Sequence, residues 1–129
     1  MLKRKIAVKQ TVRPLKSKKG SPFTHQWKLQ VVGKNDKGED EDIGYYVKKV
    51  CYHLHETFQN PKRDIEKFPY KIEEKGYGGF IMKIEVFFLD PKTPSFSFEY
   101  DLSLENDEKT TEYEIVRINF EFNCYFCLL

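Results

Sequence analysis

The 129-residue chain lacks long apolar runs, and none approaches the roughly 20 residues that a membrane-spanning helix needs. Its amino-terminal residues, MLKRK, lack the apolar stretch of a secretory signal. Cysteine is scarce, and three cysteines, an odd number, exclude a framework in which every thiol is paired. These absences favour a reducing nuclear or cytosolic compartment, and we expect no membrane partner.

A helical apolar period is also missing, because no segment holds one over three turns. The dominant period is two: Trp27, Leu29 and Val31, for example, alternate with polar side chains, and such alternation predicts strands. Aromatic residues make up 16% of the chain, which favours strands as well. The clearest predicted strands lie near residues 5–10, 27–31, 50–55, 83–88, 95–101 and 115–122.

Turn-forming residues separate the predicted strands. They occur at residues 19–22 (KGSP), 35–38 (NDKG), 60–61 (NP), 90–91 (DP) and 105–107 (END). Short strands with regular turn signals over about 125 residues are typical of a sandwich. We therefore predict one all-β domain over residues 1–129, an antiparallel β-sandwich of seven to eight strands.

Charge is distributed unevenly, although the net charge is only +2. Residues 1–20 carry eight Lys or Arg and no acid, whereas acids gather in residues 39–42 and between residues 99 and 114. The basic segment could make weak contact with DNA phosphates, and the acidic stretches could meet a cationic peptide. The alternative interpretation is that both are solvated surfaces.

The most informative motifs lie between residues 54 and 80. Two turn-like segments, LHETF at 54–58 and EEKGYGGF at 73–80, place aromatics beside small or hydroxyl residues. NPKR at 60–63 and FPY at 68–70 lie between them, and FTHQW at 23–27 lies upstream. In this order the motifs resemble the YEATS domain, a family of chromatin readers that bind acylated lysine. The resemblance implies an immunoglobulin-like β-sandwich in a nuclear protein.

The motif residues themselves suggest a slot at the loop end of a sandwich, where function is commonly carried. Phe58 and Tyr77 could face one another there, with glycines beside Tyr77 leaving room and Phe23 closing a wall. Two rings suit a flat, neutral group such as the amide of acyl-lysine. The Thr57 hydroxyl and the Tyr77 backbone N–H could satisfy that amide, whereas the charge of an unmodified lysine would lack a partner.

The resemblance also implies which residues form the site. It implies a histone-peptide contact for Asp101, and a roomier pocket because Gly78 stands where some members have Ala or a larger residue. The implied partners are an acylated tail peptide of histone H3, carrying acetyl- or crotonyl-lysine, and a chromatin-associated protein complex. The residues implied to bind the acyl-lysine are Phe23, His55, Thr57, Phe58, Gly76, Tyr77, Gly78 and Phe80.

A metal site is a competing interpretation. Cys51, His53 and His55 are spaced by two and share a predicted strand face, and a C-x-x-C follows at residues 124–127. The second half of a paired-cysteine zinc pattern is missing, however, and strand neighbours on one face stand about 6–7 Å apart. Strand cysteines that act as small hydrophobes fit the pattern better, so we expect no metal and no cofactor.

Catalysis is a second competing interpretation. His55 near Thr57 suggests a base and a nucleophile, but the chain has neither a nucleophile-elbow motif nor a phosphate loop. We therefore expect that the protein is not an enzyme and that His55 orients the hydroxyl. A third possibility stays open, in which the sandwich is a protein–protein interaction module of a chromatin complex without acyl-lysine binding.

Overall fold

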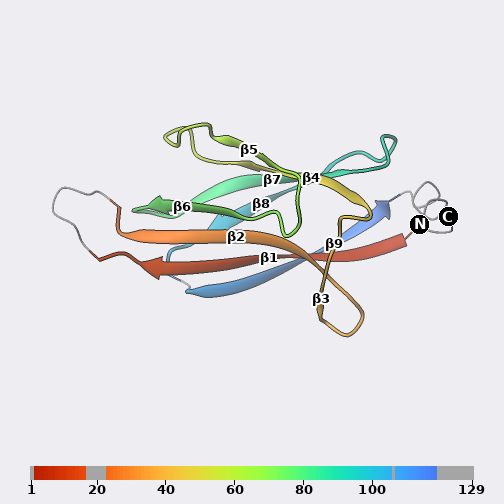
Figure 1. Ribbon diagram of the computed structural model, residues 1–129, viewed down its shortest axis with the longest axis horizontal. Coiled ribbons are helices and arrows are strands. Elements are labelled where there is room, and N and C mark those ends of the chain that lie inside the picture. The colour runs from red at the N-terminus through yellow and green to blue at the C-terminus, as the bar shows by residue number, and fades with distance from the viewer. Residues whose placement is uncertain (1, 17–22, 106, 119–129) are drawn as a thin grey trace.

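The computed structural model describes residues 2–16, 23–105 and 107–118. Within these ranges every regular element is a β-strand, and the strands form two antiparallel sheets that face one another (Figure 1). No helix in these ranges is long and apolar enough to cross a membrane. The predicted antiparallel β-sandwich is confirmed, with nine strands in the described residues instead of seven to eight. The short strands β3, β5 and β6 are not among the six clearest predicted ones.

The first sheet has the order β3-β2-β1-β9, and β6 pairs with β2 on the edge that β3 also uses. The second sheet has the order β5-β4-β7-β8. The strands of the first sheet are β1 (Leu2–Pro14), β2 (His25–Lys34), β3 (Asp40–Glu41), β6 (Ile72–Gly76) and β9 (Glu108–Ile118). The strands of the second sheet are β4 (Val47–His53), β5 (Lys62–Ile65), β7 (Phe80–Phe88) and β8 (Phe96–Leu102).

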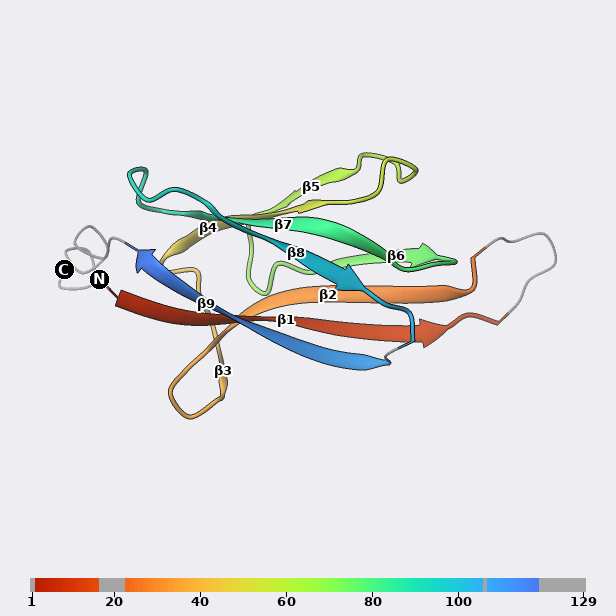
Figure 2. The ribbon, with the colours of Figure 1, turned by 180° about the vertical axis from the view of Figure 1, so that it is seen from behind.

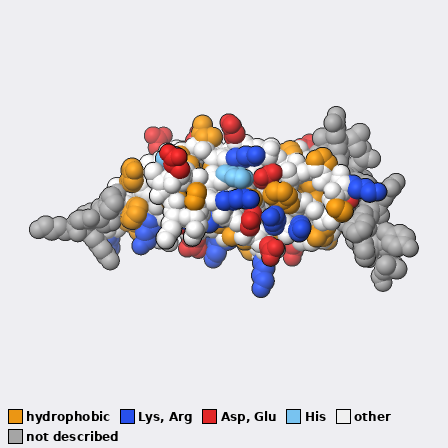
Figure 3. All heavy atoms as spheres, turned by 90° about the horizontal axis from the view of Figure 1, so that it is seen from above, with side chains coloured by type: hydrophobic (Ala, Val, Ile, Leu, Met, Phe, Trp, Pro, Cys, Tyr) orange, Lys and Arg blue, Asp and Glu red, His pale blue; other side chains and the backbone are white. Residues whose placement is uncertain are grey.

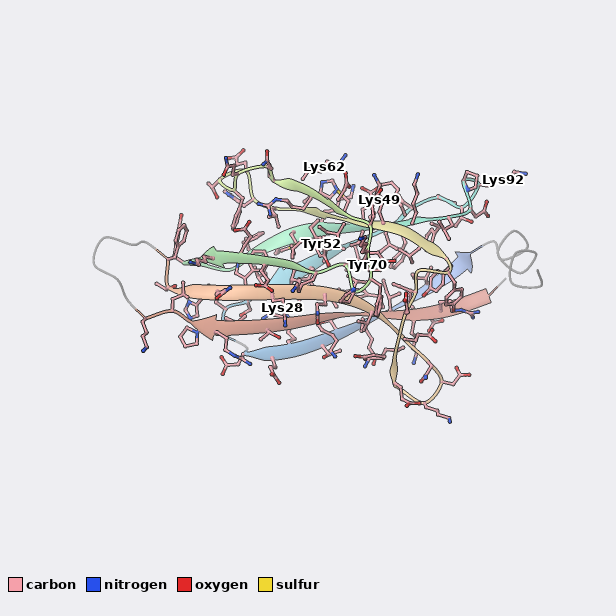
Figure 4. All side chains as sticks on the ribbon, viewed as in Figure 1. Lys28, Lys49, Tyr52, Lys62, Tyr70 and Lys92 are labelled. Atoms are coloured by element: carbon pink, nitrogen blue, oxygen red, sulfur yellow. The ribbon has the colours of Figure 1, made fainter. Side chains whose placement is uncertain are left out.

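The core lies between the sheets and follows the predicted alternation. Trp27, Leu29 and Val31 of β2 are at most 1% exposed, and Tyr52 of β4 is completely buried opposite them. Figure 4 shows Tyr52 and Tyr70 between the two layers. Burying a large apolar side chain stabilises the fold by about 1.5–3 kcal/mol. Further core residues are Ile6, Val8, Val12, Val50, Met82, Ile84, Val86, Tyr100, Leu102 and Ile115.

The last strand begins earlier than its sequence predicts. β9 starts at Glu108 and pairs with β1 along its length, so the predicted start at Ile115 is wrong. Its early residues, EKTTEYE at 108–114, are polar or charged except for Tyr113, and this pattern carries little apolar signal. Long-range pairing with β1 therefore decides the strand start, because local alternation is weak there.

Two predicted turns have the expected chemistry. The Asn35 side-chain oxygen accepts hydrogen bonds from the N–H groups of Lys37 and Glu39, and Gly38 has a φ of +77°. Asp90 accepts from the Lys92 N–H and from the hydroxyl of Thr93. The predicted turn at residues 19–22 and Asn106 of the turn at 105–107 lie outside the described residues.

The arrangement of the edge strands positions the site. β5 is an edge strand of one sheet, and β6 lies at an edge of the other. The turn between β4 and β5 lies at the same end of the sandwich as the turn between β6 and β7, as Figures 1 and 2 both show. Two loops from different sheets therefore meet where the sandwich opens.

Candidate functional site

A cavity of about 1230 Å³ occupies this open end. Its walls come from three stretches of the chain: residues 23–26 at the start of β2, residues 55–63 in the turn after β4 and in β5, and residues 73–80 from β6 to the start of β7. All eight residues predicted to bind an acyl-lysine line it. They are Phe23, His55, Thr57, Phe58, Gly76, Tyr77, Gly78 and Phe80.

The first wall is a short turn that its own hydrogen bonds close. The Leu54 N–H donates to the Pro61 carbonyl at 2.7 Å, and the Phe58 N–H donates to the His55 carbonyl at 3.0 Å. Inside the turn, His55 Nδ1 lies 2.9 Å from Thr57 Oγ1 and accepts from the Thr57 N–H at 3.3 Å. The turn therefore places a hydroxyl and an aromatic ring side by side on the cavity wall.

The hydrogen bonds of His55 determine what the Thr57 hydroxyl can offer. Because Nδ1 accepts from the backbone N–H, we assign its proton to Nε2, and the Thr57 hydroxyl then donates to Nδ1. The lone pairs of Oγ1 remain for an external N–H group. This geometry agrees with the expectation that His55 orients the hydroxyl.

Trp27 lies directly beneath the wall. It is 1% exposed, which confirms that it belongs to the core, and its ring meets Phe58 and Phe80 edge-on, with centroids 6.2 Å away in each case. Its Nε1 is buried and has no hydrogen-bond partner among the described residues. A Cβ on Gly76 would lie 3.5 Å from this nitrogen, so the glycine brings the cavity wall close to an unpaired donor.

The second wall is the turn after β6. Tyr77 is 70% exposed, and no ring contact joins it to Phe58 in the described part of the chain. The expected pair of parallel rings is therefore not stacked here; both rings line the cavity and leave the space between them open. The Tyr77 N–H donates no hydrogen bond to another described residue, so it is available as a donor.

The neighbouring glycines have different surroundings. A Cβ on Gly78 would meet nothing within 4 Å, which fits the expectation of a roomy pocket. A Cβ on Gly79 would lie 2.3 Å from the Leu102 carbonyl oxygen of β8, closer than real contacts allow. Gly79, which was not among the predicted site residues, therefore lets the turn pack against β8.

Asp101 lies outside the cavity lining. It is an exposed residue of β8 that pairs in register with Ile81 of β7, one position beyond Phe80. Its carboxylate makes no hydrogen bond or ion pair with the described residues, while its carbonyl accepts from Lys109. Its predicted contact with the peptide outside the slot stays a prediction.

The polar half of the cavity was not predicted from the sequence. Residues 59, 60 and 63 approach it from one sheet, and residues 26 and 73–75 from the other. The motifs NPKR and EEKG contain most of these positions, but local spacing gave no reason to connect them. The polar side chains are Gln26, Gln59, Asn60, Arg63, Glu73, Glu74 and Lys75.

The structure separates the three residues that the competing metal interpretation brought together. Cys51 Sγ lies 3.6 Å from His53 Nε2 on the outer face of the second sheet, but His55 follows the end of β4 and lines the cavity instead. The prediction that the three residues share one strand face is therefore wrong. No group of three or more His, Cys, Asp or Glu among the described residues could hold a metal ion. Cys124 and Cys127 lie outside those residues.

The thiol of Cys51 is protected as well. Burial, followed by a hydrogen bond to Asp64, raises the pKa of Cys51 to about 11. Figure 3 views this outer face, where Lys and Arg side chains are interspersed with Asp and Glu. A protonated, buried thiol on a face of mixed charge behaves as a small hydrophobe.

The fold and the cavity together define a β-sandwich with an open cavity where its two sheets part. The particular family follows from its sequence: the chain belongs to the YEATS family, whose sequence model matches residues 22–106. It is 47% identical to Protein AF-9 of Homo sapiens over 83 residues, which cover 64% of this chain and 14% of that protein. It is 30% identical to "Something about silencing protein 5" of Saccharomyces cerevisiae over 131 residues, which cover 96% of this chain.

The chain thus spans about half of the length of the second relative, 52%, and much less of the first. Among solved structures, it matches "Crystal structure of the Yaf9 YEATS domain bound to H3K27ac" with a TM-score of 0.80 and 28% identity. The match covers 99% of this chain and 94% of the other. The immunoglobulin-like sandwich implied by the sequence resemblance is therefore confirmed.

Proposed function

We propose that this chain is a non-catalytic nuclear reader that binds acetyl- or crotonyl-lysine on a histone tail, most simply that of histone H3. One observation carries the proposal: eight residues from three separate stretches of the chain, chosen for this role from sequence, line a single cavity. By family, we assign the reader to a complex that regulates transcription or modifies chromatin. The Yaf9 YEATS domain bound to H3K27ac supports the choice of ligand.

The chemistry of the walls suits an acyl-lysine amide. Phe58 and Tyr77 offer aromatic faces, each worth about 0.5–1.5 kcal/mol beyond burial against a flat ligand. The lone pairs of Thr57 Oγ1 would accept the amide N–H, and the Tyr77 N–H would donate to the acyl oxygen. Both polar atoms of the ligand would then be satisfied, which avoids a cost of about 1–3 kcal/mol for each buried unpaired group.

Selectivity would come mainly from the penalty on the wrong ligand. An unmodified lysine would bring an ammonium group between aromatic rings and neutral donors, where it loses its hydration. Beyond the slot, the unpaired carboxylate of Asp101 would attract the basic residues that flank the modified lysine. Because Asp101 is exposed, its contribution should be modest and should fade with salt.

Weak contact between DNA and the basic amino-terminal segment stays a prediction. Two of its cations already have partners in this chain: Lys9 lies 2.7 Å from Asp40, and Arg13 lies 3.6 Å from Glu108. These pairs reduce the charge that the segment presents to phosphates.

The decisive experiment is a calorimetric titration with four peptides of one histone H3 sequence. The central lysine is acetylated, crotonylated, trimethylated or unmodified. We expect both acyl peptides to bind about tenfold or more tightly than the other two, because an unpaired buried charge costs more than 1.4 kcal/mol. In the Asp101→Asn variant, all four peptides should bind slightly more weakly, and only at low salt.

Equal affinity for all four peptides would contradict the slot and favour an interaction module that docks through charge. A catalytic role is tested in the same samples. After long incubation a reader leaves the acyl peptide intact, whereas release of the free lysine would favour the His55–Thr57 pair as base and nucleophile.

A further inference from the structure

The two walls of the cavity belong to different sheets. The turn with Thr57 and Phe58 joins β4 to β5, and the turn with Tyr77 follows β6. In the described part of the chain, β5 pairs with β4 and β6 pairs with β2, so no ladder of backbone hydrogen bonds joins one wall to the other. The width of the slot therefore depends on side chains.

Arg63 of β5 spans this gap. Its Nη2 donates to Glu74 Oε1 of β6 at 2.7 Å and to the Gln59 carbonyl at 2.7 Å. Its Nε donates to the Asn60 carbonyl at 2.6 Å. One guanidinium group thus holds the carbonyls of the turn after Phe58 and, at the same time, a carboxylate of the opposite sheet.

This contact is less exposed than the ion pair that lies nearest to it in the sequence of β6. The side chains of Arg63 and Glu74 are 25% and 27% exposed, whereas those of the nearby pair Lys71–Glu73 are 50% and 43% exposed. Partial burial weakens screening, and the planar fork of arginine satisfies several acceptors in fixed directions. Among the described residues, the Arg63–Glu74 contact is the only side-chain hydrogen bond or ion pair that joins β5 or residues 54–61 to β6.

We propose that Arg63 is a positioning residue, which sets the distance between the Phe58 wall and the Tyr77 wall through Glu74. The proposal rests on the acyl-lysine function for its effect on ligands. A slot of fixed width admits a flat crotonyl group and resists a butyryl group, which has the same number of carbons but bends out of the plane. We call the Arg63–Glu74 contact the clamp. Without the clamp the turn after β4 would relax, and the preference for crotonyl over butyryl would weaken.

The test uses three variants of the whole chain. Arg63→Met keeps the apolar stem and removes every donor, and Glu74→Gln keeps the shape of the acceptor and removes its charge. Asp64→Asn is the matched control, because Asp64 neighbours Arg63 on β5 but pairs with Lys49 at 3.6 Å, away from the cavity. Crotonyl and butyryl peptides are titrated, and hydrogen exchange of the Phe58 amide is measured by NMR.

We expect Arg63→Met to lower the ratio of crotonyl to butyryl affinity toward one and to accelerate Phe58 exchange by about tenfold, as the loss of charge-assisted bonds predicts. Glu74→Gln should move both quantities in the same direction by less, and Asp64→Asn should leave them unchanged. A merely structural role would lower the melting temperature without moving the affinity ratio.

The outcomes separate the two proposals. A wild-type chain that binds neither acyl peptide refutes the acyl-lysine function. In that case the hydrogen-exchange rate of the Phe58 amide in the variants still tests the clamp. Wild-type exchange rates and affinity ratios in both Arg63→Met and Glu74→Gln would overturn the clamp and leave the reader function standing. An equal effect of Asp64→Asn would also overturn it, since the effect would then not depend on the contact with β6.

Discussion

Two groups of aromatic residues in this sandwich differ in how much of each side chain is exposed to solvent. In the closed interior, Tyr52 and Tyr70 are at most 1% exposed, and the Tyr52 hydroxyl donates to the Tyr70 carbonyl. At the open end, Phe23 is 41% exposed and Tyr77 is 70% exposed. The first group is covered by the opposite sheet, whereas the second lies where β5 and β6 leave the two sheets apart.

The comparison shows that aromatic content alone does not distinguish core from site. A tyrosine that packs between sheets stabilises the fold, because its ring leaves water and its hydroxyl finds a partner. A tyrosine that stands on a loop with no ring contact adds little stability and remains available for a ligand. Substitutions in the two groups should therefore separate stability from binding.

The largest expected effect comes from the pair Tyr70→Ala and Tyr77→Ala. Removing the buried Tyr70 ring should cost about 3–5 kcal/mol of unfolding free energy, as for other large core aromatics. Tyr77→Ala should leave the unfolding free energy within about 0.5 kcal/mol, as for other exposed positions, and should abolish binding of the acyl peptide. Chemical denaturation and calorimetry on the same samples measure both quantities.

Phe58 is expected to behave between these extremes. Its ring lines the cavity and is also half-buried against Trp27 and Phe80. Its removal should therefore reduce both stability and binding. If Tyr77→Ala instead unfolded the chain while Tyr70→Ala did not, the distinction between the two groups would be wrong.

An intermediate effect on stability is expected from substitution of Gly79, with the adjacent Gly78 as its control. Gly79→Ala should force the turn away from the Leu102 carbonyl, because the new Cβ would otherwise lie 2.3 Å from that oxygen. We expect a loss of about 1–3 kcal/mol from such overpacking, together with weaker peptide binding. Gly78→Ala is the matched control, since its Cβ meets open space. Equal melting temperatures for the two variants would contradict the close approach of the turn to β8.

The smallest effect is a loss of stability at alkaline pH that originates in the closed interior. Burial, with a smaller effect of Asp42, raises the pKa of Tyr70 from 10.0 to about 12. The neutral phenol is thus favoured in the folded state, so its contribution is complete below pH 10 and declines as the pH rises toward 12.

Melting curves between neutral pH and pH 12 measure this effect, with Tyr70→Phe as the comparison. The variant lacks the ionisable group, so its stability should fall less steeply over the same range. An identical slope in the two proteins would show that Tyr70 does not contribute to the alkaline transition.

Much of the fold was predictable because its signals are local. Trp27, Leu29 and Val31 alternate strictly with polar residues, and each takes the predicted inward direction. β9 was placed too late, since Thr111 and Tyr113 point inward among charged residues and only their pairing with β1 defines the strand. β5 and β6 are short, and their alternation is too brief to distinguish from a loop.

The site was predictable only in part. The residues that resemble a known motif were found, and the structure brings them to one cavity. Arg63 and Gly79 were missed because their importance depends on Glu74 and Leu102, which lie on strands other than their own. A spacing along one strand contains no information about the distance to another sheet.

Sequence by itself determined which side chains of the strongly alternating strands face inward and which motifs stand in the turns, because both properties depend on a residue and its immediate neighbours. Tertiary structure alone decided that the Tyr77 ring stands open while Tyr70 is buried, and that Arg63 reaches the opposite sheet. The reason is geometric: the separation of two sheets at their edges results from the packing of the whole core, and no single segment contains it.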